Sequence, residues 1–265
     1  MEPSTFPPSD RASLTLQQGP GWDLMQRVKR RAGYNPESCP DGIINLSGAI
    51  NNGPLAGSDN VLEAAAGFFN RFFEPANPIL KDQVVAANGV TSLNNMTVWA
   101  LCDGGDGILY TTLNFYKLNY DLSVRKDIVT IPVSTSSVGF PFDAAVLIPV
   151  LESAIQSHPD VRYRMLFLCN PSNPQGGCYS TKTLETLAAW CAERKMHLVV
   201  DEINAMSTFD GMSFSSILTI PAHKNVHCLY GEPADSCGGR EIDVCSCSSP
   251  HLLFYVLTDT GGFHG

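Results

Sequence analysis

The chain has 265 residues, of which 44% are hydrophobic and 16% charged, and its formal net charge is −9 at pH 7. This composition is typical of a globular protein, and an acidic balance with no basic block argues against nucleic acid or an anionic membrane as a partner. The longest apolar runs are far shorter than a membrane span. Nine cysteines without a basic-then-apolar leader indicate reduced thiols in a cytoplasmic protein. We expect no metal site, since Cys237, Cys245 and Cys247 have no fourth ligand at finger-like spacing.

The first part of the chain leads from a polar segment into alternating elements. Residues 1–20, rich in Ser, Pro and Gln, predict a flexible arm. Trp22–Arg31 predicts a short amphipathic helix with a basic face, and apolar residues at helical spacing predict a helix with a buried face over Val61–Phe73. A strand is expected at Gln83–Ala87, and a glycine turn then leads into a helix over Leu93–Leu101.

The second part continues this alternation. Strands are expected at Gly107–Thr111, Asp127–Val133, Met165–Cys169, His197–Asp201 and Val226–Tyr230. Helices are expected over Ala144–Ser157 and Thr181–Lys195, the second with Thr181 as its N-cap. Strands that alternate with helices predict an α/β fold with three layers, α/β/α, around a mostly parallel sheet.

Two polar motifs follow strands of this predicted sheet. Asn170–Gly176 has the pattern Asn-Pro-x-Asn-Pro-x-Gly, and Asp201 and Glu202 end the strand that comes next. In open α/β sheets, ligands bind at the carboxyl ends of the strands. The plainer alternative is that Asn-Pro is turn chemistry and that the two carboxylates form a solvated strand end.

These motifs resemble those of the class I/II aminotransferase family, pyridoxal-phosphate enzymes of fold type I. They are most similar to its fungal 1-aminocyclopropane-1-carboxylate synthase-like branch. The resemblance covers 42–231, with one gap after Asn51. It implies an N-terminal arm with a short helix over 1–41, a partial cofactor-binding large domain over 42–231 and a tail outside the family over 232–265. The family's C-terminal small domain is expected to be absent.

The resemblance also implies how the ring of pyridoxal 5'-phosphate is held. Asp201 corresponds to the carboxylate that keeps the ring nitrogen protonated, and Asn173 to the donor to the phenolic oxygen. Asn204 stands where relatives have a tyrosine that binds the same oxygen. Phe115 is the candidate for the stacking ring, with a role as core filler left open.

The phosphate is expected at the glycine turn. Gly89, Val90 and Thr91 open a predicted helix, where free backbone N–H groups and the positive end of the helix dipole favour an anion.

The catalytic base of the family is missing. Relatives place the Schiff-base lysine just after the strand that matches Val226–Tyr230, whereas this sequence has no lysine after Lys224. We therefore expect no catalytic residue, little or no turnover, and any cofactor to be held non-covalently. Ile50 replaces a substrate-recognising glutamate of the synthase, so cyclopropane formation is not expected.

The tail after Gly231 has two interpretations. The family's single antiparallel strand follows the lysine and lies between the first strand and the last parallel one. The apolar run Leu252–Leu257 is expected to fill that gap as a surrogate strand. Alternatively, Gly231-Glu232 can be encoded GGT-GAG, which contains a splice-donor pattern, and a translated intron would account for the tail.

The resemblance implies an aminotransferase-like protein that acts on amino acids or their derivatives, with fungal secondary metabolism as a setting. Three alternatives stay open: a non-catalytic remnant that pairs with a full-length paralogue, a carbon–sulfur lyase-type relative, and an unrelated α/β binding protein. The expected partners are an amino-acid-like small molecule and a second chain, in a homodimer or a heterodimer with a paralogue.

Overall fold

A computed structural model describes residues 9–10, 59–125, 127–139, 142–208, 213–221, 224–231 and 252–257. Its centre is a seven-stranded sheet with the order β1-β7-β6-β5-β4-β2-β3. The strands are β1 Val84–Asn88, β2 Asp106–Thr112, β3 Val129–Ser134, β4 Arg162–Cys169, β5 His197–Asp201, β6 Val226–Gly231 and β7 Leu252–Leu257. The five strands β6, β5, β4, β2 and β3 are neighbours in that order and pair in parallel. Strand β7 is antiparallel to both of its neighbours, β1 and β6. The prediction of a mostly parallel sheet is confirmed.

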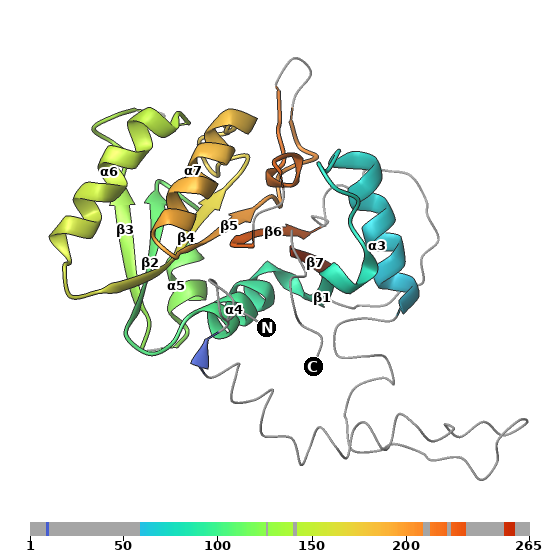
Figure 1. Cartoon of the computed structure of the whole chain (residues 1–265), viewed down its shortest axis with the longest axis horizontal. Coiled ribbons are helices and arrows are strands. Elements are labelled where there is room, and N and C mark those ends of the chain that lie inside the picture. The colour runs from blue at the N-terminus through green and yellow to red at the C-terminus, as the bar shows by residue number, and fades with distance from the viewer. Residues whose placement is uncertain are drawn as a thin grey trace, which may run out of the picture.

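Helices cover both faces of this sheet, as Figure 1 shows. They are α3 Asp59–Phe72, α4 Gly89–Leu101, α5 Leu118–Ser123, α6 Ala144–Ser157 and α7 Thr181–Glu193, with short 3-10 turns η1 Lys81–Gln83 and η2 Ile217–Thr219. Alternate residues of one strand point to opposite faces. Accordingly Leu198 and Val200 of β5 join the core with α3, α6 and α7, whereas Val199 joins a second core with α4 and α5. The three-layer prediction is confirmed.

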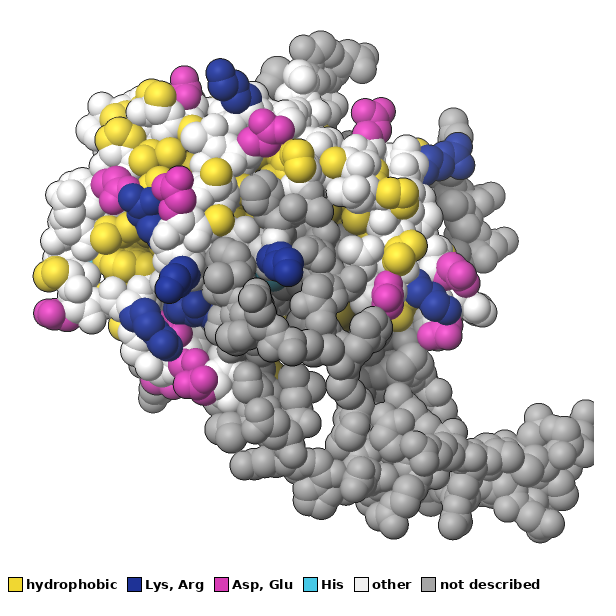
Figure 2. Space-filling view, viewed as in Figure 1, with side chains coloured by type: hydrophobic (Ala, Val, Ile, Leu, Met, Phe, Trp, Pro, Cys, Tyr) yellow, Lys and Arg dark blue, Asp and Glu magenta, His cyan; other side chains and the backbone are white. Residues whose placement is uncertain are grey.

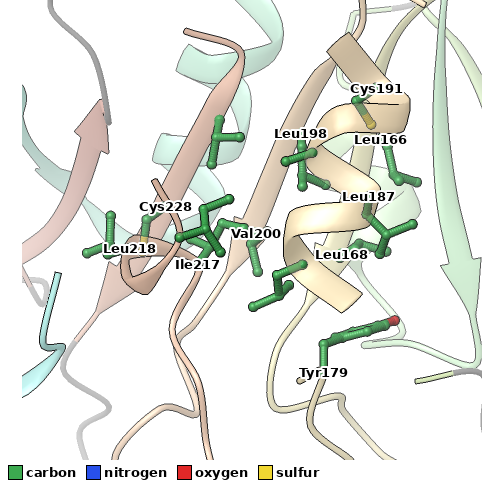
Figure 3. Packing of buried hydrophobic residues seen from close by; sticks show 14 of the residues in the cluster. Leu166, Leu168, Tyr179, Leu187, Cys191, Leu198, Val200, Ile217, Leu218 and Cys228 are labelled. Carbon is green, nitrogen blue, oxygen red and sulfur yellow. The ribbon is translucent and has the colours of Figure 1, made fainter. Parts of the chain in front are cut away.

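The larger core holds the central strands in place. Figure 3 shows Leu187 and Cys191 of α7 beside Leu166 of β4, with Ile217 of η2 beside Val200 of β5. All five side chains are fully buried. Close packing of this kind fixes where β5 ends, and with it the residues that follow.

The tail supplies the strand that was expected to complete the sheet. β7 lies between β1 and β6, and Tyr255 pairs with Val85 on one side and with Leu229 on the other. Without β7, the facing edges of β1 and β6 would expose unpaired backbone N–H and C=O groups. The surrogate-strand hypothesis is confirmed in the structure.

Local details differ from the sequence-based expectations. The N-cap of α7 is Ser180 and not Thr181, because Ser180 has extended backbone angles and its Oγ accepts a hydrogen bond from the Thr183 N–H at 3.2 Å. Phe72, expected on the buried face of its helix, is 51% exposed, because the helical rotation of about 100° per residue turns it away from the face that Phe69 and Phe73 bury. The helix after the glycine turn begins at Gly89, earlier than predicted.

Part of the predicted flexible arm is docked. Ser9 is buried; its backbone N–H donates to Ala100 O at 2.7 Å and its hydroxyl to Trp99 O at 2.8 Å. These carbonyls lie in the last turn of α4, where no further helical N–H is available to bind them. The helix expected over Trp22–Arg31 lies outside the described residues.

The surface carries charges of both signs. On the face in Figure 2, Lys and Arg side chains lie among Asp and Glu side chains. Within the described part of the chain, none of the helices is both long and apolar enough to cross a membrane. Among the described residues, five cysteines are free thiols: Cys102, Cys169, Cys178, Cys191 and Cys228.

Candidate functional site

A cavity of about 200 Å³ lies at the carboxyl ends of β4 and β5, next to α4 and α5. The lining residues are Val90, Thr91, Asn94, Asn114, Phe115, Leu118, Asp121, Phe167, Cys169, Asn173, Asp201, Ile203 and Asn204. Six of the seven residues predicted to hold the cofactor are among them. The seventh, Gly89, is the first residue of α4, directly before Val90. The structure therefore brings the predicted residues to one place.

Asp201 is the buried acid of this cavity. It ends β5, is 8% exposed, and its Oδ1 accepts a hydrogen bond from the Ile203 N–H at 3.1 Å. Burial raises the pKa of its carboxyl to about 7; the Ile203 N–H opposes this rise and the negative charge of Asp121 adds to it. The carboxylate thus lacks compensation, and a positive charge in the cavity would stabilise it.

Glu202 points away from the cavity and has a structural role. It is fully buried, and its carboxylate accepts hydrogen bonds from Ser216 Oγ at 2.6 Å, the Ile217 N–H at 2.5 Å and Cys228 Sγ at 3.5 Å. Burial raises its pKa to about 8 against the effect of these donors. The alternative of a solvated strand end is wrong for both carboxylates, because the segment around η2 covers one and the cavity encloses the other.

The two asparagines of the Asn-Pro motif have different surroundings. Asn170 is buried and ties the loop down: its N–H donates to Asp201 O at 2.8 Å, its Nδ2 to Ser215 O at 2.9 Å, and its Oδ1 accepts from the Tyr179 N–H at 3.1 Å. Asn173 lines the cavity instead. A saturated Asn170 thereby holds Asn173 at the site.

Asn204 lies at the cavity but also supports the loop. Its Nδ2 donates to the Pro171 carbonyl at 3.3 Å. A tyrosine at this position would extend further into the cavity. The shorter amide is partly committed to the loop, which lowers its capacity to bind a ligand oxygen.

The end of the cavity near α4 was expected to hold a phosphate. Thr91 donates its hydroxyl hydrogen to Asp121 Oδ2 at 3.0 Å. No lysine or arginine is among the described lining residues. An anion here would depend on the backbone N–H groups at the start of α4, which have no partner within the helix.

Phe115 lies at the mouth of the cavity. Its side chain is 41% exposed and packs edge-on against Tyr116, with the ring centroids 4.9 Å apart. The alternative role as core filler is wrong, since a filler would be enclosed. An exposed ring beside a cavity is available to pack on a flat ligand.

Sequence reasoning missed three polar residues of the cavity: Asn94, Asn114 and Asp121. Asn94 could have been found, because it follows Thr91 by three residues and therefore shares its face of α4. Asp121 lies on α5, a six-residue helix with too few apolar repeats to be recognised from periodicity.

Two other cavities differ from this one in their lining residues. One of about 220 Å³ shares Asn173 and Asn204 with the first and is otherwise lined by the Asn-Pro loop, Ser207 and Thr208. A larger cavity, of about 720 Å³, lies at the first turns of α6 and α7 and contains none of the predicted residues. Size alone does not identify the site; the buried acid does.

The residues present fit the ring of pyridoxal phosphate. The observation that decides this is the buried, undercompensated carboxyl of Asp201 in a cavity with an exposed aromatic ring at its mouth. A protonated ring nitrogen is the kind of partner that such a carboxyl requires. The phosphate end fits through backbone donors at α4.

Residues 34–231 match the family model for aminotransferase class I and II. The chain is 30% identical to the aminotransferase verI of Clonostachys rogersoniana over 61% of this chain and 37% of that protein. It is also 30% identical to 1-aminocyclopropane-1-carboxylate synthase 2 of Solanum lycopersicum over 86% of this chain and 44% of that protein. The chain thus spans less than half the length of these relatives.

Solved structures show the same fold. An aromatic aminotransferase from Pyrococcus horikoshii has a TM-score of 0.62 and 17% identity, with 78% of this chain and 51% of that chain covered. A pyridoxal-phosphate-bound C-S lyase from Staphylococcus hominis, complexed with L-cycloserine, has a TM-score of 0.61 and 15% identity, with 80% and 49% covered.

Proposed function

Because the chain belongs to the class I and II aminotransferase family, we propose that it is an aminotransferase-like protein that binds pyridoxal phosphate in the Asp201 cavity. The observation that carries this proposal is the carboxyl of Asp201, which lines the cavity, accepts a hydrogen bond from the Ile203 N–H and has its pKa raised by burial. The family match over 34–231 supports it, since that range includes the whole cavity.

Each lining residue then has a part in binding. Asp201 would hold the protonated ring nitrogen, Asn173 would donate to the phenolic oxygen with Asn204 as a weaker second donor, and Phe115 would pack on the ring. When bound, the cofactor supplies an electron-withdrawing ring for chemistry at the Cα of an amino acid. The main contribution of Asp201 is to keep the proton on the ring nitrogen.

The phosphate belongs at the first turn of α4. Gly89, Val90 and Thr91 would hold it through backbone N–H groups, with the Thr91 hydroxyl shared with Asp121. Binding at this end is therefore expected to be weak, because the described lining residues add no cation.

Covalent attachment is not part of the proposal for this chain. The sequence has no lysine after Lys224, and Lys224 precedes β6, at the end of the sheet opposite Asp201. We therefore propose that the residues present here bind the cofactor without turning over a substrate. The substrate of a complete enzyme with this site would be an amino acid or a derivative, by transamination or carbon–sulfur cleavage.

A second chain is the proposed protein partner, either another copy or a full-length paralogue. The segment 113–120, which carries Phe115 of the cavity, has four exposed apolar or aromatic side chains: Leu113, Phe115, Tyr116 and Tyr120. Patches of this kind are covered when chains associate. Light scattering during size-exclusion chromatography tests the dimer, and a monomer at micromolar concentration contradicts it.

We also place the protein in the cytoplasm, consistent with the free thiols.

The test of cofactor binding is an absorbance titration of the full chain with pyridoxal phosphate. Wild type is expected to give a saturable spectral change that dialysis removes, and Asp201→Asn to bind at least about tenfold more weakly. Because exposed lysines also react with the aldehyde, only the difference between wild type and Asp201→Asn counts. Equal binding by both proteins contradicts the proposal.

A further inference from the structure

Asn94 carries an unused hydrogen-bonding group at the cavity. Its side chain is 1% exposed, lines the cavity from the second turn of α4, and its Oδ1 has no hydrogen-bond partner. Buried polar atoms are nearly always paired, and leaving one unpaired costs free energy. Such an atom in a ligand-sized cavity requires an explanation.

The surroundings of Asn94 limit what could pair with it. Asp121 and Asp201 also line the cavity, and Asp121 is close enough to raise the pKa of Asp201. A carboxylate only accepts hydrogen bonds, and the hydroxyl hydrogen of Thr91 already goes to Asp121. The part of the cavity beside the second turn of α4 and α5 therefore presents acceptors and needs a donor from outside the protein, whereas the backbone N–H groups proposed to hold the phosphate lie at the first turn of α4.

We propose that Asn94 is a ligand-binding residue of this cavity, whose Oδ1 accepts a hydrogen bond from an N–H or O–H group of the bound molecule. The inference rests on the proposed function and deepens it. It restricts the ligand to molecules that place a donor, such as a protonated nitrogen, at the α4 and α5 side of the cavity.

The proposal gives Asn94 opposite effects on stability and on binding. In the free protein its unpaired oxygen is a cost, so Asn94→Leu, which is close in size and apolar, should be more stable than wild type. In the complex the same oxygen gains a partner, so the variant should bind more weakly. A purely structural asparagine would lower stability when replaced and leave binding unchanged.

The experiment uses the full chain and two probes, pyridoxal phosphate and pyridoxamine, the second of which lacks the phosphate. Asn94→Leu is expected to raise the thermal midpoint of the free protein by about 2–4 °C and to weaken binding of either probe about tenfold. Asn95→Leu is the matched control: Asn95 is the next residue of the same helix and does not line the cavity. It should change neither quantity.

The outcomes separate the two proposals. If wild type and Asn94→Leu bind a probe equally well, the role of Asn94 is overturned and the cavity function stands. A lower thermal midpoint for Asn94→Leu likewise overturns it, as a structural role would predict. If wild type binds neither probe, both proposals are overturned. Higher stability combined with weaker binding is the supporting result.

Discussion

Asp201 and Glu202 are adjacent carboxylates, both of them buried, with different surroundings. Burial raises both pKa values, to about 7 and about 8. Glu202 accepts hydrogen bonds from Ser216, Ile217 and Cys228 in a sealed interior. Asp201 accepts one from Ile203 and faces a cavity. The end of β5 thus carries one acid that is sealed in the interior and one acid that we propose binds the cofactor.

The difference shows that a shifted pKa alone does not identify a site. His197 and His227 make the same point at the opposite end of β5 and β6. Their ring nitrogens are 3.0 Å apart, and burial lowers the pKa of both side chains, yet they lie in the core away from the cavity. What distinguishes Asp201 is unused hydrogen-bonding capacity directed into a space that a ligand can occupy.

The largest effect on stability is expected at Glu202, the acid in the sealed interior. Glu202→Ala leaves the hydroxyl of Ser216 and the N–H of Ile217 without an acceptor, and each buried unpaired donor costs about 1–3 kcal/mol. Together with the lost packing, the free energy of unfolding should fall by about 4 kcal/mol. Urea unfolding followed by circular dichroism measures it. Glu193→Ala, at an exposed position of α7, should change stability by less than about 0.5 kcal/mol. A Glu202→Ala protein as stable as this control would contradict a structural role.

At Asp201, the acid that faces the cavity, the expected effect on stability depends on pH. The pKa of Asp201 is raised from 3.8 in the unfolded chain to about 7 in the folded one, so the folded state holds the proton more strongly. Its contribution to stability is fully present below pH 3.8 and is lost as the pH rises toward 7. Asp201→Asn removes this dependence. The free energy of unfolding of the variant minus that of wild type should therefore rise by about 3 kcal/mol from pH 5 to pH 8.

The measurement is a pair of urea titrations at each pH. The contribution of His197 and His227 to stability has the opposite pH dependence. It is lost as the pH falls below 6.5, because burial lowers the pKa of both side chains. Both proteins contain these histidines, so their effect cancels in the difference. A difference that stays constant between pH 5 and pH 8 would show that Asp201 does not titrate with a raised pKa.

Much of the fold could be predicted from the sequence, for physical reasons that particular elements show. Alternating apolar runs located β4, β5 and β6 and the helix α6 with its bounds. The position of β7 was predicted from the family resemblance, which places an antiparallel strand between β1 and β6, and from the apolar run Leu252–Leu257 that could fill this place. The Asn-Pro motif and the carboxylates that end the next strand placed Asn173 and Asp201 at one cavity, because parallel strands end at the same edge of the sheet.

The rest depends on contacts between distant segments. The burial of Glu202 requires Ser216 and Ile217 to fold over it, and no local pattern encodes that contact. Asp121 reaches the cavity from the short helix α5. The spacing of Asn94 from Thr91 could have placed Asn94 at the cavity, but its unpaired oxygen is known only from the tertiary structure. Sequence therefore identified the residues that carry a family motif and missed those whose role arises from tertiary packing.

The smallest effect is expected at the cavity mouth. Phe115→Leu keeps an apolar side chain but removes the flat ring, and stacking between aromatic groups contributes about 0.5–1.5 kcal/mol. Binding of pyridoxal phosphate should weaken about threefold to tenfold. The free energy of unfolding should change by less than about 0.5 kcal/mol, because the ring is 41% exposed. Tyr116→Leu, at the neighbouring exposed ring that does not line the cavity, is the control and should leave binding unchanged. A large loss of stability with Phe115→Leu would instead assign Phe115 to the sealed interior, together with Glu202.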